Sequence, residues 1–281
     1  MSRGAKPLWQ GSGGVPQIQF PPPSWPGRGA GGWSKAFFST LLKTPTGGQE
    51  PPTPGVPKPP QESRQTYDPG PMVVIVSTQQ VREAVEVLRR GGVIAFPTDT
   101  LYGLGAWAFS REGVERIFVI KGRPSSMALP LLLAEASQLA EVAAEVPDVA
   151  WTLVHRFWPG ALTLVLRKAP SIPDLVTGGE PTVAVRIPDH AVARELVRLL
   201  GAPITGTSAN RTGAPPARTA QEVIEHLGDA VDLVVDGGEC PLGSPSTVVD
   251  CSQGALRILR EGAISREALE EALGAPLPAT R

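Results

Sequence analysis

Two cations, Lys121 and Arg123, stand two residues apart in the stretch Lys121-Gly122-Arg123-Pro124. An ammonium and a planar guanidinium together suit a phosphate chain, because one is a mobile point charge and the other a flat fork of donors. The same cations are also ordinary partners for the C-terminal end of a helix, whose carbonyl groups carry partial negative charge. The pair alone is therefore compatible with an anion site and with a simple helix terminus.

Short polar side chains gather in further stretches, each of which lies next to an apolar, strand-like run. These stretches are Thr98-Asp99-Thr100, Thr207-Ser208-Ala209-Asn210 and Ser246-Thr247. No serine among them has the setting of a nucleophile elbow, and the chain has no P-loop or paired-glycine dinucleotide motif. The pattern favours a phosphate-rich ligand, such as a nucleotide, and chemistry that depends on positioning and charge stabilisation. Ordinary capped turns are the alternative reading of each stretch.

Alternating strand-like and helical patterns must position these groups. Strands are expected over 73–76, 93–96, 129–133, 161–166, 182–188, 231–235, 246–250 and 256–260. Helices are expected over 81–88, 110–120, 139–146, 147–157, 191–200, 219–227 and 265–273, with Ser110, Thr219 and Ser265 as N-caps. Arg186 is expected to point outward from the apolar face of its strand. The alternation predicts an α/β domain with a twisted mixed sheet flanked by helices.

Composition divides the chain at Met72. Of the 31 prolines 15 lie before that residue, as do 12 of the 31 glycines, so residues 1–71 are predicted to be a disordered tail and residues 72–281 the folded domain. Cys240 and Cys251 are too few for a disulfide framework or a four-ligand zinc site. No protein-built metal site is expected. We also expect a reduced, cytoplasmic setting and no membrane segment, because no apolar run is long enough to cross a bilayer.

Seven motifs in order over residues 72–270 resemble the YrdC/TsaC family. They are Phe96-Pro97-Thr98-Asp99-Thr100 with Tyr102-Gly103-Leu104, Lys121-Gly122-Arg123-Pro124, Trp158-Pro159-Gly160, Val185-Arg186-Ile187-Pro188, Thr207-Ser208-Ala209-Asn210, Pro245-Ser246-Thr247-Val248 and Leu259-Arg260-Glu261-Gly262. The resemblance implies a YrdC-like domain with a deep concave site. It also implies a nucleotidyltransferase, an L-threonylcarbamoyladenylate synthase that makes threonylcarbamoyl-AMP and pyrophosphate from L-threonine, bicarbonate or CO2, and ATP. The product would serve the formation of threonylcarbamoyladenosine in tRNA.

The resemblance also implies roles for individual residues. The groups implied to act in catalysis are Lys121, Arg123, Ser208 and Asn210. The ATP-binding residues would be Lys121, Arg123, Thr182, Ser208 and Arg260, and the threonine-binding residues Thr100, Arg186 and Ser246. Mg²⁺ is expected to accompany ATP, and a downstream tRNA threonylcarbamoyl transferase complex is the expected partner.

The sequence departs from the family pattern just after Pro124. Met127-Ala128 stand where many relatives carry Asn-Pro or Lys-Pro, and Leu132 falls where some relatives have a histidine at the threonine site. The chain is expected to lack the second C-terminal domain of longer relatives. An RNA-binding module without catalysis is the main alternative function, since YrdC-like domains have a basic concave surface. Carbamoyl-adenylate chemistry of the hydrogenase-maturation kind is less favoured, because the chain lacks the cysteine pairs of those proteins.

Overall fold

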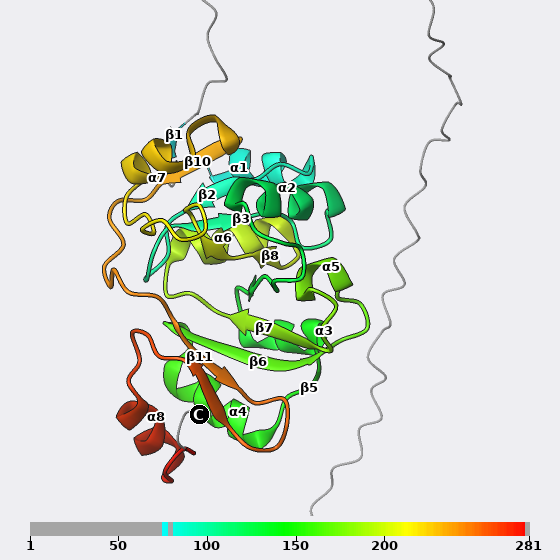
Figure 1. The fold of residues 1–281 in the computed structure, drawn as a ribbon, viewed down its shortest axis with the longest axis vertical. Helices are drawn as coiled ribbons and strands as arrows, with labels where there is room; N and C mark the ends of the chain where they lie inside the picture. The colour runs from blue at the N-terminus through cyan, green and yellow to red at the C-terminus, as the bar shows by residue number, and fades with distance from the viewer. Residues whose placement is uncertain (1–74, 78–80, 279–281) are drawn as a thin grey trace, which may run out of the picture. The chain divides into compact units, whose positions relative to one another are not determined.

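The computed structural model describes residues 75–77 and 81–278, so the predicted tail over 1–71 lies outside the described residues (Figure 1). The strands are β1 (Ile75–Ser77), β2 (Ile94–Phe96), β3 (Gly103–Gly105), β4 (Leu131–Leu132), β5 (Ala143–Glu145), β6 (Leu162–Lys168), β7 (Thr182–Arg186), β8 (Ile204–Thr205), β9 (Thr207–Ser208), β10 (Leu233–Asp236), β11 (Thr247–Asp250) and β12 (Arg257–Arg260). The helices are α1 (Val81–Arg89), α2 (Arg111–Lys121), α3 (Leu139–Val142), α4 (Asp148–Phe157), α5 (Asp174–Thr177), α6 (Ala191–Leu200), α7 (Ala220–Leu227) and α8 (Arg266–Leu273). The predicted α/β class is confirmed.

The strands are divided between two sheets, both of mixed parallel and antiparallel pairing. One sheet has the order β1-β10-β2-β3-β9, and the other has the order β12-β11-β6-β7-β4-β8 with β5 paired to β6. In Figure 1 β2 and β3 lie in the upper part of the ribbon, whereas β6 and β7 lie in the lower part beside α4 and α8. Buried aliphatic side chains fill the space between sheets and helices, which is why both sheets read as apolar runs in the sequence.

The chain passes directly from one sheet to the other at Gly206. β8 belongs to the seven-stranded sheet and β9 to the five-stranded sheet, and Gly206 is the single residue between them. A Cβ atom at this position would stand 2.4 Å from Cγ of Leu132, well inside van der Waals contact. Only glycine therefore lets the two sheets meet here with Leu132 in place.

Local capping explains where three helices begin. The hydroxyl of Ser110 accepts from the backbone N–H of Gly113 at 3.2 Å, that of Thr219 from Glu222 and that of Ser265 from Ala268, each also at 3.2 Å. The cap on α2 matters most for the site, because this helix ends at Lys121. Gly122 follows in the left-handed conformation, with φ of 61°, and so ends the helix before Arg123.

The prediction of helix over 139–146 was wrong in its second half. α3 ends at Val142, and Ala143 to Glu145 form β5, which pairs antiparallel with β6. Two effects override the helical propensity of the alanines. The edge of β6 offers a ladder of backbone partners, and Val146 precedes Pro147, a position that disfavours helical backbone.

Thr247 joins the start of β11 to the turn that follows β12. Its side chain is fully buried. The hydroxyl donates to the carbonyl oxygen of Ile264 at 2.6 Å and accepts from the N–H groups of Gly262 and Ile264 at 2.9 and 3.1 Å. One side chain therefore satisfies three backbone groups next to Ser246, a predicted site residue.

Replacing Thr247 with valine keeps the shape but leaves these half-buried backbone groups without this partner. We expect the free energy of unfolding to fall by about 3 kcal/mol, measured by urea denaturation. Thr152→Val is the matched control, because that hydroxyl is exposed on α4 and donates only to Asp148 O. The control should stay within about 0.5 kcal/mol of wild type, and an equal loss in both variants would contradict this account.

Candidate active site between two sheets

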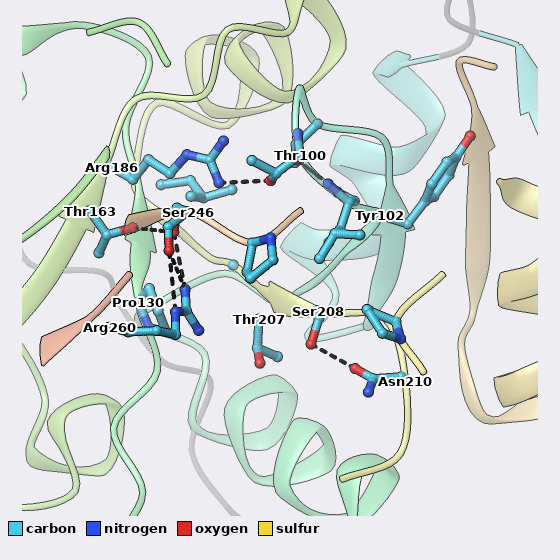
Figure 2. A pocket seen from close by; sticks show the side chains of 17 residues that line it. Thr100, Tyr102, Pro130, Thr163, Arg186, Thr207, Ser208, Asn210, Ser246 and Arg260 are labelled. Atoms are coloured by element: carbon cyan, nitrogen blue, oxygen red, sulfur yellow. Dashed lines mark hydrogen bonds between the residues drawn. The ribbon is translucent and has the colours of Figure 1, made fainter. Parts of the chain in front are cut away.

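A cavity of about 320 Å³ opens between the two sheets (Figure 2). Both sheets and the loops that follow their strands contribute to its wall. The lining residues are Thr98, Thr100, Leu101, Tyr102, Gly103, Pro130, Leu132, Thr163, Arg186, Gly206, Thr207, Ser208, Asn210, Pro216, Pro245, Ser246 and Arg260. Six predicted site residues, far apart in sequence, therefore share one cavity: Thr100, Arg186, Ser208, Asn210, Ser246 and Arg260.

Arg186 forms one end of the cavity, on the face of β7 opposite to Val183 and Val185, and it is buried there. Its Nε donates to Gly160 O at 2.8 Å, its Nη1 to the hydroxyl of Thr100 at 2.9 Å, and its Nη2 to Oδ1 of Asp99 at 2.5 Å. The guanidinium can be buried because a carboxylate and two further oxygens replace its water. Burial lowers the pKa of Arg186, and the charge of Asp99 opposes that shift.

Arg186 has N–H donors that its partners in the structure do not use, and these could bind the oxygens of an anionic ligand. A guanidinium has five N–H donors, and the three bonds above leave one donor on each terminal nitrogen. Where two such donors lie parallel on one planar group, they match two oxygens of a carboxylate or a phosphate. In Figure 2 Arg186 and Thr100 lie together on the side of the cavity that also holds Ser246.

Ser246 is held from two sides. Its hydroxyl lies 2.8 Å from that of Thr163 on β6, and Nη2 of Arg260 donates to its carbonyl oxygen at 2.9 Å and to its hydroxyl at 3.2 Å. Arg260 stands close enough to Arg186 for its charge to contribute to the lowered pKa of that residue. This end of the cavity therefore carries two guanidinium groups and one buried carboxylate.

Lys121 acts on the opposite end of the cavity from behind its wall. Its ammonium is buried and donates to Ser208 O at 2.6 Å, to Asn210 O at 2.9 Å and to Asn210 Oδ1 at 3.2 Å. The hydroxyl of Ser208 donates to the same Oδ1 at 2.6 Å. These bonds use all three ammonium donors, so Lys121 clamps the segment that presents Ser208 and Asn210. Burial, with a smaller contribution from Arg123, lowers the pKa of Lys121 to about 8.

Besides Lys121, which lies behind the wall, two further predicted ATP-binding residues, Arg123 and Thr182, do not line the cavity. Arg123 is half-buried, with its guanidinium carbon 5.5 Å from the ring centre of Phe118 and its Nη2 donating to Ala128 O at 3.3 Å. Its Nε is buried and has no hydrogen-bond partner in the described part of the chain. Thr182 begins β7, and Arg186 ends it, so at about 3.3 Å per residue the two lie roughly 13 Å apart.

Sequence reasoning missed several residues of the wall. Thr163 looked like an ordinary strand residue, and only its inward position on β6 could have indicated a role. Tyr102 contributes to the wall, but in Figure 2 its ring points away from the cavity, and its hydroxyl donates to Gly238 O at 2.9 Å. Burial raises the pKa of that hydroxyl. Tyr102 thereby anchors the segment that leads to Ser246.

The positions that depart from the family pattern fall on both sides of this wall. Leu132 lines the cavity and pairs in register with Arg186. Met127 is exposed outside it, and Ala128 contributes its carbonyl oxygen to Arg123. Leu132 is therefore the departure that changes the chemistry of the wall, since it offers an apolar surface where a histidine would offer a hydrogen bond.

The side chains of the site bear on two questions, how a metal ion could be bound and whether a cysteine could act as a nucleophile. Within residues 75–77 and 81–278, no group of three or more His, Cys, Asp or Glu side chains could hold a metal ion. A neutral oxygen such as Ser208 Oγ suits a Mg²⁺ ion that keeps most of its shell of water and phosphate oxygens, whereas Asn210 Oδ1 already accepts from Lys121 and Ser208. Burial raises the pKa of Cys240 to about 11, which keeps this thiol protonated near neutral pH and unsuited to nucleophilic attack.

None of the described helices is both long enough and apolar enough to cross a bilayer.

Comparison with known proteins identifies relatives of this chain. The family model Sua5_yciO_yrdC, described as "Telomere recombination", matches residues 86–262. The threonylcarbamoyl-AMP synthase of Pyrococcus abyssi is 40% identical over 209 residues, which cover 72% of this chain and 62% of that protein. The Bacillus subtilis protein of the same name is 42% identical over 196 residues, which cover 69% of this chain and 57% of the relative. The chain thus spans less than two thirds of the length of these two curated relatives.

A solved structure shares this arrangement of strands and helices. The crystal structure of Pyrococcus abyssi Sua5 in complex with L-threonine superposes with a TM-score of 0.70 at 40% sequence identity. The match covers 73% of this chain and 62% of the Sua5 chain.

Replacing Lys121 with methionine should loosen the segment around Ser208. Three charge-assisted bonds are lost, and because two of them hold backbone carbonyls, we expect the amides of Ala209 and Thr212 to exchange with deuterium at least about 10-fold faster. Lys168→Met is the matched control, because that ammonium bonds to Asp174 and Ile172 O and does not line the cavity. Wild-type exchange rates in Lys121→Met would contradict the clamp.

Proposed function

The chain belongs to the Sua5/YciO/YrdC family, and we propose on that basis that it is an L-threonylcarbamoyladenylate synthase. The proposed enzyme is a nucleotidyltransferase that converts L-threonine, bicarbonate or CO2, and ATP to threonylcarbamoyl-AMP and pyrophosphate. The observation that carries the proposal is the cavity, with a guanidinium at one end and a clamped Ser208 and Asn210 at the other. One end suits an amino-acid carboxylate, and the other suits a phosphate chain.

We assign the amino acid to the Arg186 end. The two spare donors of Arg186 bind the α-carboxylate, and the hydroxyls of Thr100 and Ser246 flank it at hydrogen-bonding positions. The Pyrococcus abyssi relative whose structure contains L-threonine supports this choice of ligand. Leu132 supplies an apolar wall beside the carboxylate.

We assign the ATP phosphates to the Ser208 end. Ser208 and Asn210 offer polar side chains, and Lys121 holds their segment, whereas Arg260 lies beside Ser246 and would meet the phosphates only where they extend toward the amino-acid end. Arg123 and Thr182 lie outside the cavity. They would contact the nucleotide where it extends beyond the cavity wall or, for Arg123, after a movement of the 122–128 segment. Magnesium bound with ATP would find Ser208 Oγ as a ligand beside Asn210 and would supply charge neutralisation on the phosphates.

The reaction balances without a protein nucleophile. The threonine ammonium and bicarbonate form a carbamate with loss of water and a proton, which creates the C–N bond. A carbamate oxygen then bonds to the α-phosphorus of ATP, and the bond to the β-phosphate bridging oxygen breaks to release pyrophosphate. The chain's own contribution is to hold the two reactants in line and to stabilise the charge that moves onto the leaving group.

Threonylcarbamoyl-AMP is an activated acyl donor, so the proposed partner is an enzyme that transfers the threonylcarbamoyl group to tRNA. We place the protein before a tRNA threonylcarbamoyl transferase complex in that sequence of reactions.

The full chain should release pyrophosphate from ATP only when L-threonine and bicarbonate are both present. Labelled bicarbonate should appear in a product that also contains threonine and AMP, detected by mass spectrometry. Omitting each substrate in turn is the control. Steady pyrophosphate release without L-threonine, or salt-sensitive RNA binding with no product under any condition, would favour the RNA-binding alternative.

Arg186→Lys should weaken L-threonine binding selectively. A lysine cannot present two parallel donors to a carboxylate, so we expect the KM for L-threonine to rise at least about 10-fold while the KM for ATP changes little. The measurement is pyrophosphate release at varied concentrations of each substrate. Arg116→Lys is the control, because Arg116 pairs with Asp232 and does not line the cavity. Equal rises in both KM values would contradict the assignment.

A further inference from the structure

Asp99 is a buried carboxylate that stands directly behind the cavity wall. The side chains of Asp99 and Arg186 are only 7% and 8% exposed, and they form an ion pair of 2.5 Å. Thr98 and Thr100, its neighbours in sequence, line the cavity, whereas Asp99 does not. Asp99 is therefore out of reach of a ligand in the cavity and can affect that ligand only through Arg186.

Asp99 also connects three segments of the chain. Its Oδ1 accepts from the backbone N–H of Asp189 at 3.2 Å, in addition to Nη2 of Arg186. Its carbonyl oxygen accepts from the N–H of Leu242 at 3.0 Å, within the segment that leads to Ser246. The carboxylate is thus held by the N–H of Asp189 and its main chain by that of Leu242, which together make it a support for the guanidinium.

The support controls both the orientation and the charge of Arg186. Arg186 donates from Nε to Gly160 O and from Nη1 to Thr100. Its third bond, from Nη2 to Asp99 Oδ1, fixes the remaining nitrogen and prevents rotation of the guanidinium plane. The negative charge of Asp99 also offsets the positive charge of Arg186. A carboxylate ligand is then selected mainly by the direction of the two spare donors of Arg186. The net positive charge of the site, which would attract any anion, contributes less.

We propose that Asp99 is a positioning residue that gives the amino-acid end of the cavity its selectivity for a free α-carboxylate. The inference rests on the proposed function. It extends that function by naming the group that sets the substrate class, namely amino acids with an ionised carboxylate as against their amides or esters.

The test uses the full chain with Asp99→Asn, which keeps the shape of the side chain and removes its charge. The kcat/KM for L-threonine should fall about 100-fold, since a small misplacement of a positioning group costs that much, while the KM for ATP stays within about threefold. The ratio of kcat/KM for L-threonine to that for L-threonine amide should fall at least about 10-fold. A purely structural role would lower the amount of folded enzyme and leave this ratio unchanged.

Two further variants complete the design. Asp232→Asn is the matched control, because it removes a carboxylate from an Asp–Arg pair of 2.6 Å outside the cavity wall. Its discrimination ratio should equal that of wild type. In an Arg186→Lys background, Asp99→Asn should add little further loss of discrimination, because both changes act on one guanidinium.

The outcomes separate the inference from the proposed function. If wild type makes no threonylcarbamoyl-AMP, the proposed function fails. If wild type makes it and Asp99→Asn keeps the wild-type ratio, or binds L-threonine more tightly, the role of Asp99 is overturned. A poorly folding variant still gives an answer, because both substrates are measured on the same active fraction.

Discussion

A guanidinium that is removed from water must have its charge and its donors satisfied, and the cavity is built around this requirement at Arg186. The carboxylate and the hydroxyl that meet it come from the loop after β2, in the five-stranded sheet. Arg186 itself ends β7, in the seven-stranded sheet. The ion pair therefore fastens the two sheets to each other at the point where the cavity opens. The same groups that hold the fold together leave one N–H donor on each terminal nitrogen of Arg186 for the proposed ligand.

The parts of the fold that were predictable are those set by neighbours in sequence. Ser110, Thr219 and Ser265 cap helices because a hydroxyl reaches an amide three residues away, a relation visible in the sequence itself. The burial of Arg186 was not predictable in this way. Its carboxylate partner lies 87 residues earlier in the chain, and an arginine in an alternating strand has the same pattern whether it is exposed or paired.

The candidate site, like the fold, contains residues that the sequence predicts and residues that only the structure reveals. Motifs rich in hydroxyls and amides indicated Ser208, Asn210 and Ser246, and these do line one cavity. Thr163 gave no signal, because threonine is common in strands for its β-branched shape alone. Where Lys121 and Thr182 lie relative to the cavity became clear only from the structure. The Lys121 ammonium donates to the segment of Ser208 and Asn210, and Thr182 lies at the end of β7 remote from Arg186.

The bonds made by Lys121 hold the path of the main chain from Ser208 to Asn210 and depend little on which side chains this segment carries. Two of its three acceptors are backbone carbonyl oxygens, which every residue type provides. Lys121 thus holds the main chain of this segment whatever side chain stands at 208, and the bond from the Ser208 hydroxyl to Asn210 Oδ1 adds to that support. A lineage of such proteins could exchange the group offered to a ligand at position 208 while the path of the main chain stays the same.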